Sequence, residues 1–142
     1  MFASVGWAAM TERVDLPESE WRARLTSEQF KVLRKGGTER AFTGAYWDTK
    51  EPGTYRCAGC HAALFRSEDK FDSGTGWPSF TTPIHSSAVE TRRDFGFGTL
   101  RTEVLCGACG GHLGHVFDDG PGPTGQRYCM NSVSLDLEHE ET

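Results

Sequence analysis

The chain has 142 residues, 37% of them apolar and 25% charged, with a net charge of −5. This length fits one domain with its own core, and the composition is that of an ordinary globular protein. The acidic balance, without a Lys/Arg-rich run, argues against a nucleic-acid partner. No apolar stretch approaches the roughly 18–20 residues that a membrane helix needs, so we expect no membrane partner.

Residues 1–15 carry no pattern, and we expect a disordered leader there, with Met10 as an alternative start. Their start lacks the basic residues and the long apolar stretch of a secretory signal, so a cytoplasmic location is expected. Residues 16–137 are predicted to form a single domain. Residues 138–142, EHEET, are predicted to be a frayed acidic tail.

Two short helices are predicted next. Residues 17–25 begin with Pro and acidic residues, which favour the first turn of a helix. A second helix is expected from Thr26, because Thr26 and Gln29 fit a capping box and Gly36 fits a C-terminal stop. Two apolar side chains would face the core from this helix, Phe30 and Leu33.

From Tyr46 onward the apolar runs become short, and Gly and Pro recur between them, which is typical of strands and turns. We therefore predict a mainly β domain of the α+β class, with mostly antiparallel strands and two N-terminal helices. The expected strands are residues 55–57, 64–66, 89–92, 99–106, 112–117 and 127–137.

Four of the five cysteines form two matching pairs, Cys57-x-x-Cys60 and Cys106-x-x-Cys109, each with Gly in or beside it. Gly permits the tight turn that makes two thiolates converge, and four thiolates suit a closed, tetrahedral, structural zinc site. Iron would take the same ligands. Redox-active pairs or disulfides are the other interpretations; the first normally join a strand to a helix, and the second are disfavoured in a reducing cytosol.

The fifth cysteine, Cys129, stands alone in the expected strand 127–137. A lone Cys in a strand is usually a small buried hydrophobe. Here alternation along the strand would place Arg127 and Asn131 on the same face as Cys129. A nearby cation favours the reactive thiolate, so Cys129 is a candidate nucleophile.

Two further segments carry unusual residues. His112 and His115 lie three apart, which would put them on opposite faces of a strand unless Gly114 permits a bulge. Surface histidines or metal ligands are the alternatives. Trp77 lies in the Gly-rich segment 74–80, GTGWPSF, and is either a core residue or an indole that contacts a soft apolar group.

Together these segments resemble the B-type methionine sulfoxide reductases. The matching stretches are GTGWPSF, HLGHVFDDGPGPTGQRYCMNSVSL and both CxxC pairs, and TSEQFKVLRKGGTERAFTG is similar to the family's N-terminal helix and loop. The resemblance covers residues 16–137. It implies a β domain of two antiparallel sheets that reduces the R epimer of methionine sulfoxide in proteins and peptides.

The resemblance also implies a role for individual residues. Cys129 matches the nucleophile, and three residues match the polar groups of the active site: His112, His115 and Asn131. The remaining matches are a residue that packs on the substrate methyl and a supporting acid and base: Trp77, Asp119 and Arg127. Many members carry a resolving Cys where this chain has Thr75, so we expect a form with one catalytic cysteine.

We expect the Cys129 thiolate to attack the sulfoxide sulfur while His112 or His115 protonates the oxygen, with Asn131 hydrogen-bonded to either histidine. Cys129 would become a sulfenic acid, which an external thiol such as thioredoxin restores. Two rival classes remain at this point. A cysteine hydrolase also uses Cys, His and Asn but needs no reductant, and a zinc-ribbon binding module would not depend on Cys129.

Overall fold

The computed structural model describes residues 13–95 and 98–140. Most of the expected leader and the end of the expected tail therefore lie outside the described residues. Arg13 and Val14, which were assigned to the leader, contact the body: Val14 N–H donates to the Ala108 carbonyl at 2.7 Å and Arg13 to the Gly107 carbonyl at 3.2 Å. Arg13 and Val14 therefore belong to the folded domain and not to the predicted leader.

Two helices open the fold, α1 (Glu18–Arg24) and α2 (Ser27–Leu33). The expected capping box is confirmed, with the Thr26 hydroxyl accepting from Gln29 N–H and the Gln29 side chain accepting from Thr26 N–H. Gly36 follows α2 at a φ of 73°, where a Cβ would be strained. Both predicted core residues of α2 are buried, Phe30 and Leu33. Neither helix could cross a membrane, and the described residues contain no other α-helix.

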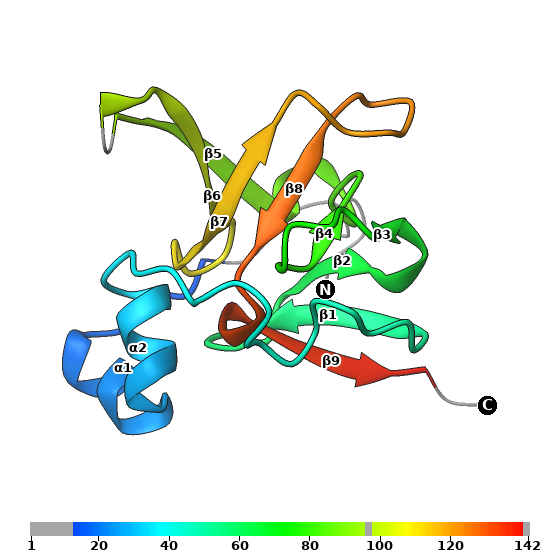
Figure 1. Ribbon diagram of the computed structural model, residues 1–142. Coiled ribbons are helices and arrows are strands. Elements are labelled where there is room, and N and C mark those ends of the chain that lie inside the picture. The colour runs from blue at the N-terminus through cyan, green and yellow to red at the C-terminus, as the bar shows by residue number, and fades with distance from the viewer. Residues whose placement is uncertain (1–12, 96–97, 141–142) are drawn as a thin grey trace, which may run out of the picture.

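The predicted pair of antiparallel sheets is confirmed. The smaller sheet has the order β2–β1–β9, formed by β1 (Gly53–Cys57), β2 (Ala63–Arg66) and β9 (Leu135–His139). It lies beneath the larger sheet and beside the helices (Figure 1). Because β9 runs to His139 and pairs with β1 as far as Gly53, Glu138 and His139 belong to a strand and not to the predicted tail.

The larger sheet has six strands in the order β3–β4–β8–β7–β6–β5. Its β7 has the predicted bounds, while β6 begins two residues later than expected. The short strands β3 and β4 were not predicted. The bounds are β3 (Lys70–Phe71), β4 (Ser79–Phe80), β5 (Val89–Asp94), β6 (Arg101–Cys106), β7 (His112–Phe117) and β8 (Arg127–Met130).

The expected strand 127–137 is wrong as a single element. β8 ends at Met130, a 3-10 turn covers Ser132–Ser134, and β9 then joins the other sheet. Asn131 stands at this break, and its side-chain amide forms hydrogen bonds with the backbone of two other segments. Its Oδ1 accepts from Glu39 N–H, and its Nδ2 donates to the Leu113 carbonyl. The chain thus changes sheets where side-chain hydrogen bonds to distant backbone groups replace the strand ladder.

Aromatic side chains fill the space between the two sheets. Phe65 of β2 stacks on Phe80 of β4 with ring centroids 4.4 Å apart, and Tyr55 of β1 meets Phe80 edge-on at 5.1 Å. Tyr128 of β8 contacts Phe65 at 5.8 Å. Each such pair adds about 0.5–1.5 kcal/mol beyond simple burial. Because Tyr128 faces this core, its neighbours Arg127 and Cys129 face the opposite side of the large sheet.

Candidate active site

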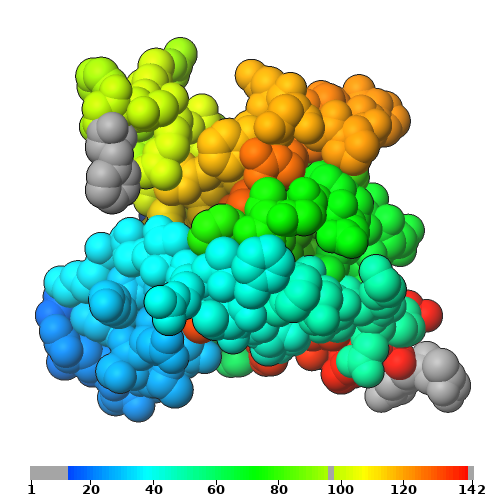
Figure 2. All heavy atoms as spheres, in the orientation of Figure 1, coloured from blue at the N-terminus to red at the C-terminus, as the bar shows by residue number. Residues whose placement is uncertain are grey.

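Cys129 lies in the middle of the large sheet, on the face away from the aromatic core. Its strand runs between β4 and β7, where Cys129 pairs with Ser79 on one side and His115 on the other. It lines a cavity of about 270 Å³, which Figure 2 shows as a hollow between the β5–β6 hairpin and the loop before β8. The other lining residues are Thr38, Thr75, Trp77, Arg101, Gly114, His115, Phe117, Arg127, Met130 and Asn131.

The surroundings of Cys129 act on its thiol in two directions. Burial is the dominant effect and raises the pKa of the thiol, because a thiolate loses water there. Thr75, Ser79 and Arg127 each lower the pKa, since they favour the anion by hydrogen bonds or by charge. Thr75 Oγ1 lies 4.0 Å from Cys129 Sγ. The thiol is therefore half-buried, next to one cation and two hydroxyls.

Arg127 is fixed by two contacts. Asp119 accepts from both Nε, at 2.8 Å, and a terminal nitrogen, at 3.2 Å, and the guanidinium carbon lies 4.5 Å from the Phe117 ring centroid. The hydrogen bond to Asp119 raises the pKa of Arg127 and lowers that of Asp119. Asp119 itself is exposed and does not line the cavity. It therefore reaches the site only through Arg127.

The two histidines lie on the same face, as the possible bulge implied. The β6–β7 register shifts by one residue beside Gly114, so that Leu113 is the extra residue. The rings of His112 and His115 are 5.6 Å apart, edge to face. His115 lines the cavity and its Nε2 lies 3.0 Å from Asp94 Oδ2. The bulge thus gathers two imidazoles on the side of Cys129.

His112 sits deeper than His115 and does not line the cavity. Its side chain is only 6% exposed, and its Nδ1 lies 2.6 Å from Glu103 Oε2. Burial lowers the pKa of His112, while the neighbouring Glu103 carboxylate opposes that effect. His112 is therefore a buried imidazole whose neutral form is favoured and whose Nδ1 is bonded to Glu103, whereas His115 is more exposed.

Trp77 and Asn131 both line the cavity and share one neighbour, Glu39, in the loop after α2. Trp77 Nε1 donates to the Glu39 carbonyl at 3.1 Å, and Glu39 N–H donates to Asn131 Oδ1 at 2.9 Å. The Glu39 carboxylate accepts from Val133 N–H at 2.9 Å. The Asn131 side chain was expected to bond to a histidine; instead, its amide group bonds to backbone groups, Glu39 N–H and the Leu113 carbonyl.

Three acidic residues of the site were missed in the sequence: Glu39, Asp94 and Glu103. Two of them are buried, Glu39 and Glu103, each 8% exposed. A signal existed for Glu103, because an acid inside the apolar run TEVLC of a strand is unusual. Nothing local marks Glu39, whose partners lie far along the chain.

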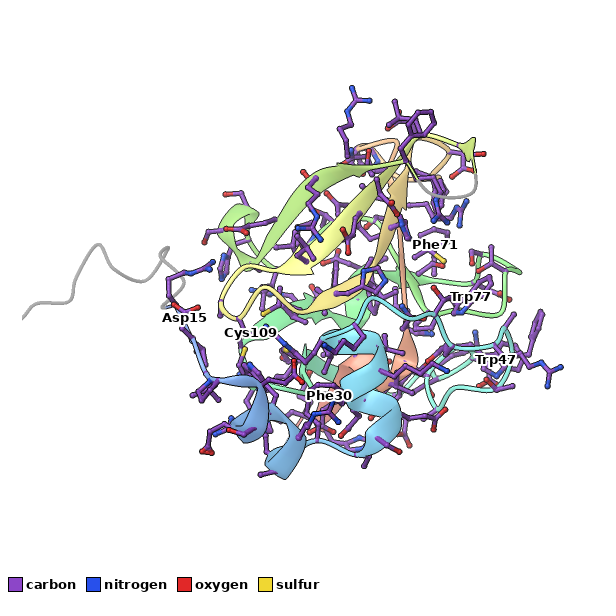
Figure 3. The ribbon with its side chains drawn as sticks, turned by 90° about the vertical axis from the view of Figure 1, so that its left-hand side faces the viewer. Asp15, Phe30, Trp47, Phe71, Trp77 and Cys109 are labelled. Carbon is purple, nitrogen blue, oxygen red and sulfur yellow. The ribbon has the colours of Figure 1, made fainter. Side chains whose placement is uncertain are left out.

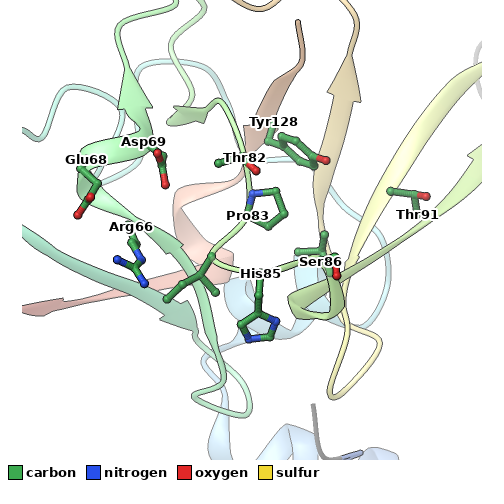
Figure 4. A pocket seen from close by; sticks show the side chains of 11 residues that line it. Arg66, Glu68, Asp69, Thr82, Pro83, His85, Ser86, Thr91 and Tyr128 are labelled. Carbon is green, nitrogen blue, oxygen red and sulfur yellow. The ribbon is translucent and has the colours of Figure 1, made fainter. Parts of the chain in front are cut away.

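A larger cavity, of about 680 Å³, lies on the other side of the large sheet (Figure 4). Tyr128 and Thr91 line it, and alternation along β8 and β5 directs them away from Cys129. Its other charged or titratable lining residues are Arg66, Glu68, Asp69 and His85. The lining contains no thiol, so the smaller cavity around Cys129 is the candidate active site.

The other four cysteines form a separate centre that could hold a metal ion. Their sulfurs all lie within 4.8 Å of one another, with Cys57–Cys109 at 3.8 Å and Cys60–Cys106 at 3.6 Å. Figure 3 shows Cys109 beside the helices, well apart from Trp77. The predicted grouping of the two CxxC pairs is therefore confirmed, and the cluster is remote from the cavity.

With this site in place, comparison with known proteins defines the class. A profile of the SelR domain matches residues 25–139, and the chain belongs to this family. Its relatives include proteins named peptide methionine sulfoxide reductase MsrB. That of Synechococcus sp. strain RCC307 is 58% identical over 124 residues, 87% of this chain and 91% of the relative. That of Leptospira interrogans is 51% identical over 131 residues, 92% of this chain and all of the relative.

The charge of Arg127 should control the reactivity of Cys129. We expect Arg127→Met to slow alkylation of Cys129 by iodoacetamide about 3- to 10-fold near neutral pH, because losing the cation raises the thiol pKa further. Peptide mass spectrometry over a time course measures the rate at Cys129 alone. Arg56→Met is the matched control, since Arg56 pairs with Glu138 on the other sheet. An unchanged rate in Arg127→Met would contradict the electrostatic role.

Proposed function

We propose that this oxidoreductase reduces the R epimer of methionine sulfoxide, in proteins and peptides, to methionine. The observation that carries the proposal is Cys129 in a half-apolar cavity, directly across the β7–β8 ladder from His115. Membership of the SelR family and the names of the relatives support the same reaction. Such a site offers a nucleophile, a proton donor and an indole within one hollow.

In the proposed reaction the Cys129 sulfur attacks the sulfur of the sulfoxide while His115 protonates the oxygen. The attack forms a bond between Cys129 Sγ and the substrate sulfur. The protonated oxygen then passes to Sγ as the S–O bond and this new S–S bond break, which leaves Cys129 as a sulfenic acid and releases methionine. Cys129 is oxidised by two electrons and the substrate is reduced by two. We assign the acid to His115 and not to His112, because His115 lines the cavity and His112 does not.

The remaining cavity residues would bind the substrate. The Trp77 indole, oriented by its bond to Glu39, offers an apolar face for the methyl group. Arg127 provides positive charge beside Cys129, and Asp119 orients Arg127. Asn131 shapes the floor from the end of β8. Selection of the R epimer would follow from this one-sided placement of indole, cation and imidazole.

Recycling would be intermolecular. The four other cysteines are grouped in the centre that could hold a metal ion. The hydroxyl of Thr75 lies 4.0 Å from Cys129 Sγ, at the position from which a resolving thiol could form a disulfide with Cys129. An external thiol, such as thioredoxin or a small thiol, attacks the sulfenic acid, releasing water and leaving a mixed disulfide. A second thiol then restores Cys129. We also propose a cytoplasmic location, where such reductants are abundant.

We propose one structural zinc ion per chain at the four-cysteine centre. Zinc–sulfur bonds of about 2.3 Å at tetrahedral angles separate two sulfurs by about 3.8 Å. Two sulfur pairs here, at 3.8 Å and 3.6 Å, fit that spacing. Four thiolates leave no open position, so the ion would stabilise the fold and take no part in the reaction.

The reaction is tested with separated R and S methionine sulfoxide and excess dithiothreitol. We expect turnover of the R epimer only, its loss in Cys129→Ser, and a rate roughly 100-fold lower in His115→Asn, the range for removing a general acid. Cys129→Ser should melt like the wild type. Equal use of both epimers, or residual turnover in Cys129→Ser, would refute the proposal. Turnover of an ester or amide without added thiol would point to a hydrolase.

The recycling route is tested by one equivalent of substrate without reductant. We expect a chain oxidised at Cys129 alone, which a small thiol then converts to a mixed disulfide. Mass-spectrometric thiol mapping locates each product. The one-cysteine route fails if a disulfide joins Cys129 to Cys57, Cys60, Cys106 or Cys109 at the rate of turnover.

The metal assignment is tested by elemental analysis of the purified protein. One zinc per chain is expected, and Cys60→Ser should lose the metal and unfold or aggregate, because binding energy of the ion is also folding energy. Cys129→Ser is the control, with unchanged metal content. A folded, active sample that contains no metal would exclude a structural ion; one that contains iron would exclude zinc.

A further inference from the structure

A row of side chains crosses the large sheet and ends at Cys129. The direct cross-strand pairs are Arg92 with Glu103, Glu103 with His115, and His115 with Cys129. In antiparallel sheets, directly paired residues point to the same face. The row therefore links the open edge strand β5 to the candidate nucleophile through three successive strand pairs.

The bulge in β7 adds His112 to this row. Because Leu113 is the extra residue, the His112 ring reaches Glu103, although Glu103 is paired with His115 in the ladder. The contact is 2.6 Å long, and the side chains of Glu103 and His112 are 10% and 6% exposed. The other Glu103 oxygen accepts from Arg92 Nε at 2.9 Å.

A carboxylate so far from water is costly unless its oxygens are bonded. Here each carboxylate oxygen of Glu103 has a partner, and only one of the two partners, Arg92, is permanently charged. The Arg92 side chain is 66% exposed and reaches in from the edge of the sheet. The other partner is a ring nitrogen, which must carry its proton to bond to the carboxylate. The contact therefore selects the form of His112 with hydrogen on Nδ1.

We propose that Glu103 is a positioning residue for the reduction step, which holds His112 with its proton on Nδ1 and its ring edge-on to His115. This inference rests on the proposed function, in which His115 acts on the substrate. Nε2 of His112 is buried and has no hydrogen-bond partner among the described protein atoms. With Nδ1 bonded to Glu103, the His112 ring is fixed edge-on to His115, with centroids 5.6 Å apart, and it supports through this ring contact the imidazole that protonates the sulfoxide oxygen.

The charged and titratable groups around His112 come from three strands. They are Glu103 on β6, His115 on β7, and Asp94 on β5, which bonds to His115 and to Arg101. Asp94 is more exposed than Glu103, at 32% against 10% of the side chain. Glu103 is therefore the only one of these acids that is both buried and in direct contact with His112.

Nitrogen-15 NMR of the histidine rings in the wild-type protein tests the contact without any substrate. We expect His112 to show a protonated Nδ1 and an unprotonated Nε2, and Glu103→Ala to lose this fixed form. Glu103→Gln is the conservative variant if the Ala variant does not fold; its amide cannot accept from both Arg92 and His112. A wild-type His112 with its proton on Nε2 alone would overturn the proposal.

The second readout is oxidation of Cys129 by the R sulfoxide in a single turnover. Glu103→Ala or Glu103→Gln should lower the maximal rate on the order of 10-fold or more, the usual size of an orienting partner's effect, with little change in the substrate concentration needed for half of it. Glu90→Gln, on the same strand as Arg92 but paired with exposed Arg13, is the control. A folded Glu103 variant with the wild-type rate, or with a loss in affinity alone, would overturn the positioning role. If the wild type itself does not react, the proposed function fails while the NMR test still stands.

Discussion

The pairing of β7 with β8 is the constraint on which the candidate site depends. It sets His115 directly across from Cys129, and it is possible only because Gly114 has no side chain. A Cβ at Gly114 would lie 2.1 Å from the Cys129 carbonyl oxygen and 2.9 Å from the Met130 Cα. Any other residue at position 114 would push β7 and β8 apart, and the His115 imidazole would move away from the Cys129 thiol. Gly114 also lines the cavity.

The four-cysteine centre lies next to the start of β7, one of the two paired strands. Cys57 ends β1 and Cys106 ends β6, while Cys109 lies three residues before β7 begins. The cluster therefore joins the small sheet to the β6–β7 hairpin, which carries Glu103 and both histidines. The proposed metal ion, bound there, would hold the turn from which β7 starts, and the bulge follows within the first residues of that strand.

Much of this architecture could be predicted from local patterns. The capping box of α2, the two CxxC pairs and the bulge near Gly114 each depend on residues close together in sequence. The error at 127–137 has a different origin. Its alternating apolar residues fit one long strand, but the break at Asn131 is made by partners 92 and 18 residues away, Glu39 and Leu113. Side-chain bonds across such distances leave no periodic signal.

The same long-range bonds explain why the residues around Cys129 come from so many parts of the chain. Glu39, in a loop, holds Trp77 through its carbonyl and Asn131 through its N–H, while its carboxylate holds the turn after β8. One oxygen of that carboxylate is buried without a hydrogen-bond partner among the described protein atoms, as is Nε2 of His112. Such groups cost about 1–3 kcal/mol each in a folded protein. Both Glu39 and His112 contact residues that line the cavity. At functional sites, proteins tolerate a local loss of folding free energy when it keeps side chains in a fixed geometry. The two buried acids thus act at different depths: Glu39 fixes two residues of the cavity around the thiol, Trp77 and Asn131, and Glu103 bonds to His112 behind His115.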